Sequence, residues 1–175
     1  MTLEETWRAR PTPTDKVTAH SYLPIYDRLL GAHRDEPLVI VEVGVREGGS
    51  LMLWRRYFPN ATIIGIDNDP AVLEVPDCFL YRHDSREKVW AHLAFPNPEI
   101  DVLIDDGDHD IRSQLDTLAA LRHAMKPGGR YFVEDIYPFE GAVRLIDAAR
   151  PQATRLYDLR DVKHRADDVL LEIRF

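Results

Sequence analysis

The stretch Leu38-Val-Ile-Val-Glu-Val-Gly44-Val-Arg-Glu-Gly-Gly-Ser50 joins a short, almost continuous apolar run to a glycine-rich turn. A run of this kind is typical of a strand that is buried on both faces of a parallel sheet. Comparable runs follow at residues 62–67, 77–81, 100–105 and 130–134. Apolar residues at helical spacing separate the runs and predict helices at residues 50–58, 85–93, 111–125 and 142–150. We expect Lys126-Pro-Gly-Gly129 to end the third of these helices.

Two further strand-like runs, at residues 154–159 and 169–175, close the chain. We expect no helix in the short segment between them, so the two strands should pair antiparallel. Strands that alternate with helices, followed by this hairpin, predict an α/β fold with an open, Rossmann-like, doubly wound sheet. In such sheets ligands bind beyond the carboxyl ends of the strands, so the residues that follow each strand are the candidates for a site.

The chain has 175 residues, a formal net charge of −8 and one cysteine. This length fits a single domain, and we expect an N-terminal arm at residues 1–14 and one domain at residues 15–175. The first helix should begin near Asp15 and end at Gly31 or His33. The acidic balance argues against a nucleic-acid partner, and no apolar run approaches the roughly 20 residues of a membrane span. The polar amino terminus and the lone cysteine favour a cytoplasmic protein.

The turn after the first strand could bring the backbone close to a ligand, because Gly44 and Gly48 allow sharp bends and a helix amino terminus follows. A dinucleotide fingerprint would require glycine where the chain has Arg46, so a pyrophosphate is disfavoured. Glu42 inside the strand suits instead a ligand with a cationic amine, such as S-adenosylmethionine (SAM). The alternative is an ordinary glycine turn between a strand and a helix.

Asp67 ends the second strand, and Asp84 follows the third. A carboxylate about 20 residues after the glycine turn is placed to accept hydrogen bonds from the ribose hydroxyls of an adenosine. Asp84 could accept a hydrogen bond from the adenine amino group. Simpler explanations remain for both, because Asp-x-Asp-Pro is a common turn and Asp84 could cap the next helix.

Acidic residues gather after the fourth and fifth strands. Asp106 follows the fourth strand, and Glu134 and Asp135 follow the fifth. If these strands are neighbours, their ends lie roughly 4.8 Å apart and the three carboxylates converge. Such a group repels itself unless a cation lies between its members, and a hard divalent ion with oxygen ligands, most simply Mg²⁺, fits this role. The alternative is a set of solvated loop residues.

His109 lies three residues after Asp106, close enough to stand beside such an ion without binding it. Imidazole titrates near neutral pH, which suits a general base that removes a proton from a hydroxyl. The competing interpretation is a histidine at the start of a helix with no chemical role.

Together these motifs resemble the class I SAM-dependent methyltransferases, and most of all the divalent-metal-dependent O-methyltransferases that modify sugars on macrolide and polyketide antibiotics of the mycinamicin and tetracenomycin type. The matching stretches are Thr14-Asp-Lys-x-x-x-His20-x-Tyr22, Val41-Glu-Val-Gly-Val-Arg-Glu-Gly-Gly-Ser-Leu51, Trp54-Arg-Arg-Tyr-Phe-Pro-Asn-Ala61, Gly65-Ile-Asp67, Ile104-Asp-Asp-Gly-Asp-His109, Lys126-Pro-Gly-Gly129 and Val133-Glu-Asp135. The glycine motif identifies only the superfamily, whereas Asp-Asp-Gly-x-His with Glu-Asp after the next strand is more specific.

The resemblance implies a seven-stranded sheet of order 3-2-1-4-5-7-6 with strand 7 antiparallel. It also implies SAM and Mg²⁺, or another divalent cation, as cofactors. The residues it assigns to SAM are Glu42, Gly44, Gly48, Asp67, Asp84 and Asp105. The residues it assigns to the metal are Asp106, Glu134 and Asp135, and His109 is the implied catalytic base.

The predicted function is therefore SAM- and Mg²⁺-dependent methyl transfer to a hydroxyl of a small molecule, with a glycosylated natural product as the expected acceptor. The alternatives are a methyltransferase of nucleic acid or protein, a nicotinamide-dependent oxidoreductase, which Arg46 disfavours, and a SAM-binding module without chemistry. The segment around His20 and Tyr22 could fold over the cofactor. A homo-oligomer stays open, because a neighbouring subunit could complete this covering.

Overall fold

The computed structural model describes residues 1–72 and 74–175. Within these residues the strands form a seven-stranded sheet of order β3-β2-β1-β4-β5-β7-β6. Strands β1 to β5 pair parallel with one another, and β7 runs antiparallel to both β5 and β6. The predicted doubly wound sheet, its strand order and the antiparallel last strand are confirmed.

The strands of this sheet are β1 (Val39–Val43), β2 (Thr62–Asp67), β3 (Phe79–Arg82), β4 (Ile100–Asp105), β5 (Met125–Val133), β6 (Ala153–Asp158) and β7 (Val169–Arg174). The helices are α1 (Leu3–Ala9), α2 (Asp15–Thr18), α3 (Leu23–Leu30), α4 (Gly49–Tyr57), α5 (Lys88–Ala94), α6 (Ile111–Leu121), α7 (Gly141–Ala149) and α8 (Arg160–Lys163). Single 3₁₀ turns follow α3 and α6, at Gly31–His33 and Arg122–Ala124.

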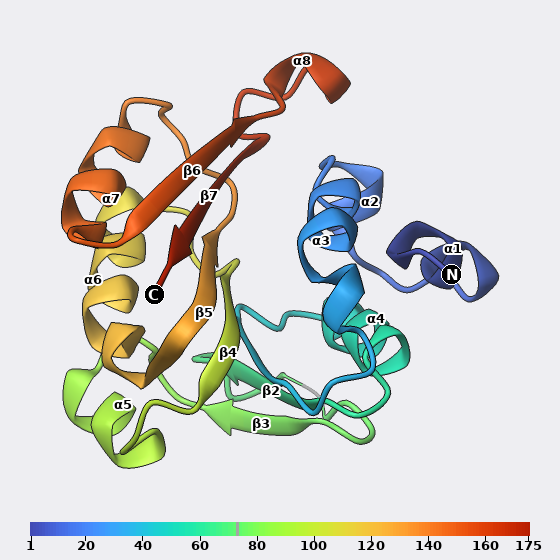
Figure 1. Ribbon diagram of the computed structural model, residues 1–175, viewed down its shortest axis with the longest axis horizontal. Coiled ribbons are helices and arrows are strands. Elements are labelled where there is room, and N and C mark those ends of the chain that lie inside the picture. Colours follow the sequence, from blue (N-terminus) through green and yellow to red (C-terminus); the bar gives the residue numbers. More distant parts are fainter. Residues whose placement is uncertain (73) are drawn as a thin grey trace.

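Helices cover both faces of the sheet, with α1 to α4 on one side and α5 to α7 on the other (Figure 1). One apolar cluster joins the sheet to α5, α6 and α7, and a second joins it to α1, α3 and α4. In the second cluster Tyr26 of α3 packs edge-on against Trp54 of α4 and Phe132 of β5, with ring centroids 5.4 and 5.0 Å apart. This packing holds α3 over the carboxyl ends of the central strands.

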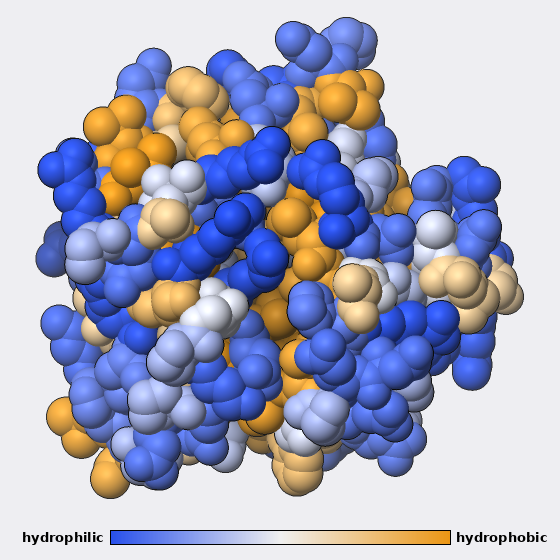
Figure 2. All heavy atoms as spheres, in the orientation of Figure 1, coloured by the Kyte–Doolittle hydropathy of each residue, from blue (hydrophilic) through white to orange (hydrophobic). Residues whose placement is uncertain are grey.

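The face seen in Figure 2 is mostly hydrophilic, and hydrophobic residues show mainly in the hollow between the two halves of the molecule and at a few places on the rim. In the part of the chain that the structure describes, no helix combines the length and the apolar character needed to cross a membrane.

The prediction of one continuous first helix was wrong. The chain forms α2, leaves the helix at Ala19 and begins α3 at Leu23. Pro24 lies in the first turn of α3, where its missing N–H is tolerated, but in the middle of a longer helix its ring would clash with a preceding carbonyl. The break allows α2 to turn toward the strand ends independently of α3.

Three other boundaries also differ from expectation. The hairpin connection contains α8, a single helical turn between β6 and β7, where we expected none. Lys126-Pro-Gly-Gly129 does not end α6, because it lies within β5, at a shift in the pairing register with β4. Helix α5 begins at Lys88, three residues later than expected, because Asp84 holds the chain in a turn by accepting from the Arg86 N–H.

The first fourteen residues contain α1, which packs against α3 and α4 and begins with a capping box between Thr2 and Glu5. Leu3 is fully buried in the second cluster. The division into an arm and a domain stays a prediction.

Candidate active site

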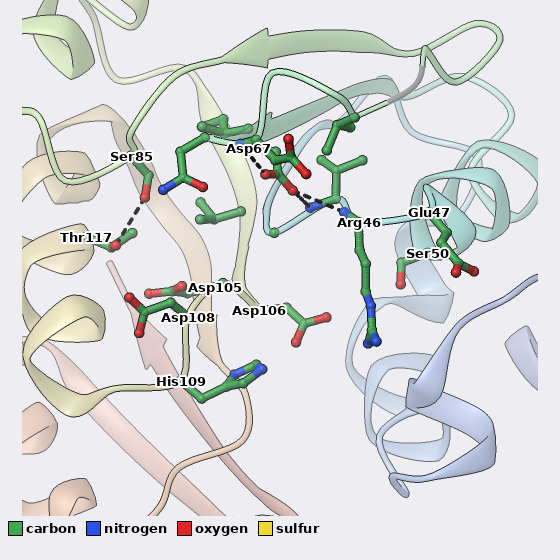
Figure 3. Close-up of a pocket in the computed structure, with 18 of the residues that line it drawn as sticks. Arg46, Glu47, Ser50, Asp67, Ser85, Asp105, Asp106, Asp108, His109 and Thr117 are labelled. Atoms are coloured by element: carbon green, nitrogen blue, oxygen red, sulfur yellow. Dashed lines mark hydrogen bonds between the residues drawn. The ribbon is translucent and has the colours of Figure 1, made fainter.

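A cleft of about 980 Å³ opens at the carboxyl ends of β1, β2 and β4, where an open parallel sheet is expected to bind ligands. Figure 3 shows Asp67 and the backbone at Arg46 along one side and Asp105, Asp106 and His109 along the other. Residues 12–15 and Thr18, before and within α2, form a further part of the wall. The volume lies within the range of small-molecule sites.

Gly44 lies where β1 passes closest to the loop after β4. Its φ is +86°, and a Cβ atom there would stand 2.1 Å from the carbonyl oxygen of Asp106. Gly48, at the start of α4, has φ +73°, and a Cβ atom would lie 2.4 Å from Val75. Backbone geometry and packing therefore require both glycines, but only Gly44 lies on the cleft wall.

Gly44→Ala is expected to lower the free energy of unfolding by more than about 2 kcal/mol, because the added methyl group meets backbone that must move. The matched control is Gly128→Ala. Gly128 has the same φ of +86° but no atom within 4 Å of its built Cβ, so it should cost only about 1 kcal/mol for the left-handed conformation. Urea denaturation of both variants measures the difference, and equal losses would show that the clash with Asp106 is relieved without cost.

Asp67 binds the glycine turn from the end of β2. Its Oδ2 accepts hydrogen bonds from the N–H groups of Val45 (2.7 Å) and Arg46 (3.1 Å), and its Oδ1 accepts from Asp69 (2.9 Å). The carboxylate is thus fixed at the cleft wall.

Asp84 also lines the cleft, but an arginine holds its carboxylate. The Arg86 guanidinium donates to both Asp84 oxygens at 2.8 Å and also donates to Ser113 at 3.0 Å. These hydrogen bonds lower the pKa of Asp84, and burial opposes the shift. The structure therefore places Asp84 at the cleft with its acceptors already engaged by Arg86.

Asp105 lies at the buried end of the cleft and is 2% exposed. Burial raises its pKa to about 7, although a hydrogen bond from the Gly107 N–H opposes the shift. Nearby, the hydroxyls of Ser85 and Thr117 lie 3.2 Å apart and join the loop after β3 to α6.

The centre of the carboxylate cluster is filled by a lysine that our sequence interpretation gave no role. Lys16 of α2 is completely buried, and its Nζ lies 2.5 Å from Asp106 Oδ2, 2.7 Å from Glu134 Oε2 and 3.3 Å from Glu42 Oε1. The strand ends bring the acids together, because the Asp106 N–H donates to Val43 and the Glu134 N–H donates to Asp105.

Charge and burial oppose each other in this cluster. Burial alone would lower the pKa of Lys16, but its attraction to Asp106, Glu134 and Glu42 outweighs burial and raises it. Burial raises the pKa of Glu42 to about 7 and that of Glu134 well above its ordinary value, and Lys16 opposes both shifts. The lysine is therefore the positive charge that allows buried acids to lie together.

Glu42 and Glu134 face this lysine and lie behind the cleft wall. Glu42 is 1% exposed and accepts a 2.5 Å hydrogen bond from the Trp54 indole. Glu134 is equally buried, and the Tyr26 hydroxyl donates to its second carboxylate oxygen. The carboxylates of both predicted ligands are therefore engaged by protein side chains.

Asp135 turns to the other side of the same strand end, in a left-handed conformation with φ +54°. Its Oδ1 accepts a 2.7 Å hydrogen bond from the Tyr22 hydroxyl, and its Oδ2 lies 3.7 Å from His109 Nε2. Ligand atoms of Asp106, His109 and Asp135 all lie within 4.8 Å of one another. This group has the oxygen-rich donor set that a divalent cation prefers.

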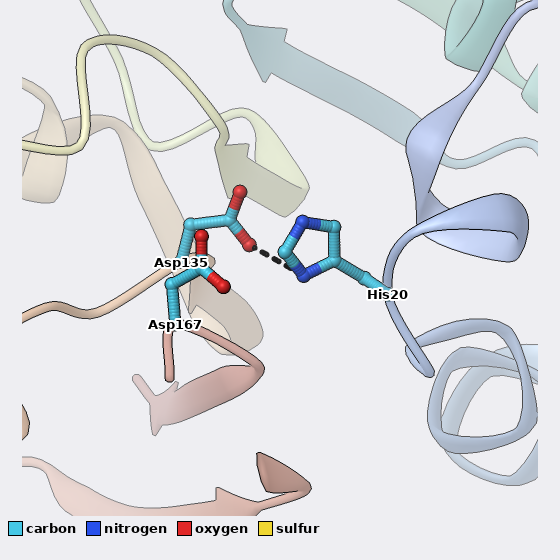
Figure 4. A group of neighbouring side chains, drawn as sticks. All are labelled: His20, Asp135 and Asp167. Atoms are coloured by element: carbon cyan, nitrogen blue, oxygen red, sulfur yellow. Dashed lines mark ion pairs between the residues drawn. The ribbon is translucent and has the colours of Figure 1, made fainter. Parts of the chain in front are cut away.

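A second group shares Asp135 (Figure 4). His20 Nδ1 lies 3.2 Å from Asp135 Oδ1, and Asp167 stands beside them. Asp167, however, is paired with Arg165 through two hydrogen bonds of 3.0 and 2.7 Å. His20 therefore orders the buried side of Asp135. We had considered that the segment around His20 and Tyr22 could fold over the cofactor; in the structure both side chains contact Asp135.

Of the predicted site residues, six line the cleft: Gly44, Asp67, Asp84, Asp105, Asp106 and His109. Glu42, Gly48 and Glu134 lie behind its wall. Asp135 lies next to His109, which lines the cleft. Sequence reasoning missed Lys16, whose only signal was its place in the Thr14-Asp-Lys motif.

The chain is similar in sequence to known proteins. The chain is 31% identical over 168 residues to the 8-demethyl-8-α-L-rhamnosyl tetracenomycin-C 2′-O-methyltransferase of Streptomyces olivaceus, which covers 88% of this chain and 44% of that protein. It is 29% identical over 127 residues to the mycinamicin VI 2″-O-methyltransferase of Micromonospora griseorubida, covering 67% of this chain and 32% of that protein. No protein-family model matches the chain.

Among solved structures, the MycE methyltransferase of the mycinamycin pathway, in complex with Mg and SAH, superposes with a TM-score of 0.79 at 22% identity. The match covers 99% of this chain and 55% of that one. A second MycE complex, with Mg, SAH and mycinamycin VI, gives a TM-score of 0.78 at 23% identity, over 99% of this chain and 54% of that one. These likenesses establish the fold.

In strand order and in sequence the chain is similar to class I SAM-dependent methyltransferases. Within that class, the similar proteins are named as O-methyltransferases of rhamnosyl tetracenomycin C and of mycinamicin VI. The chain spans less than half the length of these curated relatives.

Proposed function

We propose that this protein transfers a methyl group from SAM to a hydroxyl of a glycosylated small molecule, with the help of a divalent cation. The observation that carries the proposal is the proximity of Asp106, His109 and Asp135 at the rim of a cleft whose opposite wall holds Asp67. Relatives named as O-methyltransferases of glycosylated antibiotics support the choice of acceptor.

The cleft fits the proposed cofactor in volume and in polar lining. Asp67 would accept hydrogen bonds from the ribose hydroxyls, since its position is fixed by the N–H groups of Val45 and Arg46. The buried polar end formed by Asp105, Ser85 and Thr117 would face the remaining polar groups of the ligand. Bound SAM would supply an electrophilic methyl group, so the protein mainly aligns the acceptor with it.

The donor set at the rim fits a hard divalent cation. Asp106 and Asp135 would hold the ion, together with Glu134 if its carboxylate is released from Lys16. A cation bound there would supply positive charge that lowers the pKa of the acceptor hydroxyl.

His109 would take the proton from the acceptor hydroxyl at Nδ1, the ring nitrogen that does not face Asp135. Its side chain is 46% exposed, and Nε2 lies 3.7 Å from Asp135 Oδ2, so the carboxylate can orient the ring while the ring reaches the acceptor. General bases in this position contribute about 10²–10⁴ to the rate.

Calorimetry with S-adenosylhomocysteine (SAH) and with NAD⁺, followed by incubation with labelled SAM and a panel of rhamnosylated aglycones, tests the proposal. We expect SAH to bind, NAD⁺ not to bind, and label to appear on a sugar hydroxyl. Label on RNA or protein alone, or no affinity for SAH, would overturn it.

A further inference from the structure

Lys16 occupies the space between two of the three carboxylates that were predicted to hold a metal. Its Nζ lies 2.5 Å from Asp106 Oδ2 and 2.7 Å from Glu134 Oε2, and its side chain is completely buried. The other oxygen of Glu134, Oε1, accepts from the Tyr26 hydroxyl. Glu134 therefore has both oxygens engaged by protein donors.

These contacts leave little room for a second cation between the same oxygens. Mg²⁺ binds carboxylate oxygen at about 2.0–2.1 Å, so an ion held by Asp106 Oδ2 and Glu134 Oε2 would nearly coincide with Nζ. Two cations at that separation repel strongly in a buried site. The lysine and a three-carboxylate metal site exclude each other.

We propose that Lys16 is a built-in competitor for the divalent cation: its ammonium group neutralises Asp106 and Glu134 in the metal-free protein, and a divalent cation gains these carboxylates by displacing it. This inference rests on the cation of the proposed function. It explains how the acids on β1 and directly after β4 and β5 are tolerated without an ion. It also makes the affinity for the ion depend on a residue that is not its ligand.

Lys16 lies on a short helix beside the cleft, so a displaced Lys16 side chain can turn toward the cleft. Helix α2 has four residues, and the neighbouring Asp15 and Thr18 lie at the cleft wall. Lys163 of α8 holds the same segment by donating to the backbone carbonyls of Val17 and His20, without contacting the carboxylates. Lys163 therefore provides a matched control.

Binding of Mn²⁺ alone, measured by the loss of its free electron-paramagnetic-resonance signal, tests the competition. We expect Lys16→Met to bind Mn²⁺ at least tenfold more tightly than the wild type, and Lys163→Met to stay within threefold of it. In the Lys16→Met background, Glu134→Gln should weaken binding at least tenfold, because Glu134 is then a ligand.

Equal Mn²⁺ affinity in the wild type and Lys16→Met would overturn the proposal. So would an unchanged affinity on adding Glu134→Gln to Lys16→Met, because the ion would then sit at Asp106, His109 and Asp135, a group that an ion can occupy without displacing Lys16. Absence of Mn²⁺ binding in every variant would overturn the divalent cation of the proposed function as well. SAH calorimetry, which needs no cation, reports on the cofactor separately.

A measurement on the wild-type protein avoids any variant that fails to fold. Reductive methylation of lysines, read by mass spectrometry with and without saturating Mg²⁺, reports whether Lys16 becomes accessible. We expect Mg²⁺ to raise the labelling rate of Lys16 at least threefold and to leave that of the exposed Lys88 unchanged. Equal protection of Lys16 in both conditions would overturn the displacement.

Discussion

Asp106→Ala is expected to abolish methyl transfer while SAH still binds, and excess EDTA should have the same effect on the wild type. Asp106 belongs to the group of side chains whose ligand atoms lie within 4.8 Å of one another, and a catalytic cation contributes several kcal/mol of charge stabilisation. Because each 1.4 kcal/mol is a factor of ten in rate, the expected loss is about 10³ or more.

The measurement is transfer of label from SAM, with SAH affinity determined in parallel by calorimetry. Asp108→Ala is the matched control, since Asp108 lies two residues further along the same loop and contacts Ser113 and Arg86 away from the carboxylate cluster. Full activity in excess EDTA would refute the role of the cation, whatever the variant shows.

His109→Ala should reduce the rate of transfer by about 10²–10⁴, the usual contribution of a positioned general base. The ring stands at the cleft with Nε2 3.7 Å from Asp135 Oδ2, and a methyl side chain cannot accept the proton. SAH affinity should remain unchanged, because the base acts on the acceptor and not on the cofactor.

His83→Ala provides the comparison for this variant. His83 also lines the cleft, but its ring stacks on Trp90 at a centroid distance of 4.7 Å and belongs to neither group of side chains around Asp135. We expect His83→Ala to retain most of the activity under single-turnover conditions. A loss smaller than threefold in His109→Ala would remove His109 as the base.

Regular elements were predictable where the pattern was local. The runs at residues 62–67 and 100–105 coincide with β2 and β4, because a strand buried on both faces must be apolar at almost every position. The break between α2 and α3 was missed although Pro24 marks it. The apolar residues that indicated the helix, Tyr22, Tyr26 and Leu30, all belong to α3 or its N-cap, so their spacing carries no information about residues 15–21.

The candidate site was predictable only in part, and for a clear reason. That Asp106, Glu134 and Asp135 should meet followed from strand ends that share one edge of a sheet. Which way each carboxylate points did not follow, because Asp135 adopts a left-handed backbone that turns it away from Glu134.

By itself, the sequence determined the alternation of strands and helices, the edge at which the acids gather and the resemblance to SAM-dependent methyltransferases, since each follows from short-range patterns and motifs. Only the tertiary structure decided that Lys16 fills the space between the acids, 90 residues from Asp106 and 118 from Glu134 along the chain. The physical reason is that a buried charge finds its partners through the packing of distant segments, which no local pattern encodes.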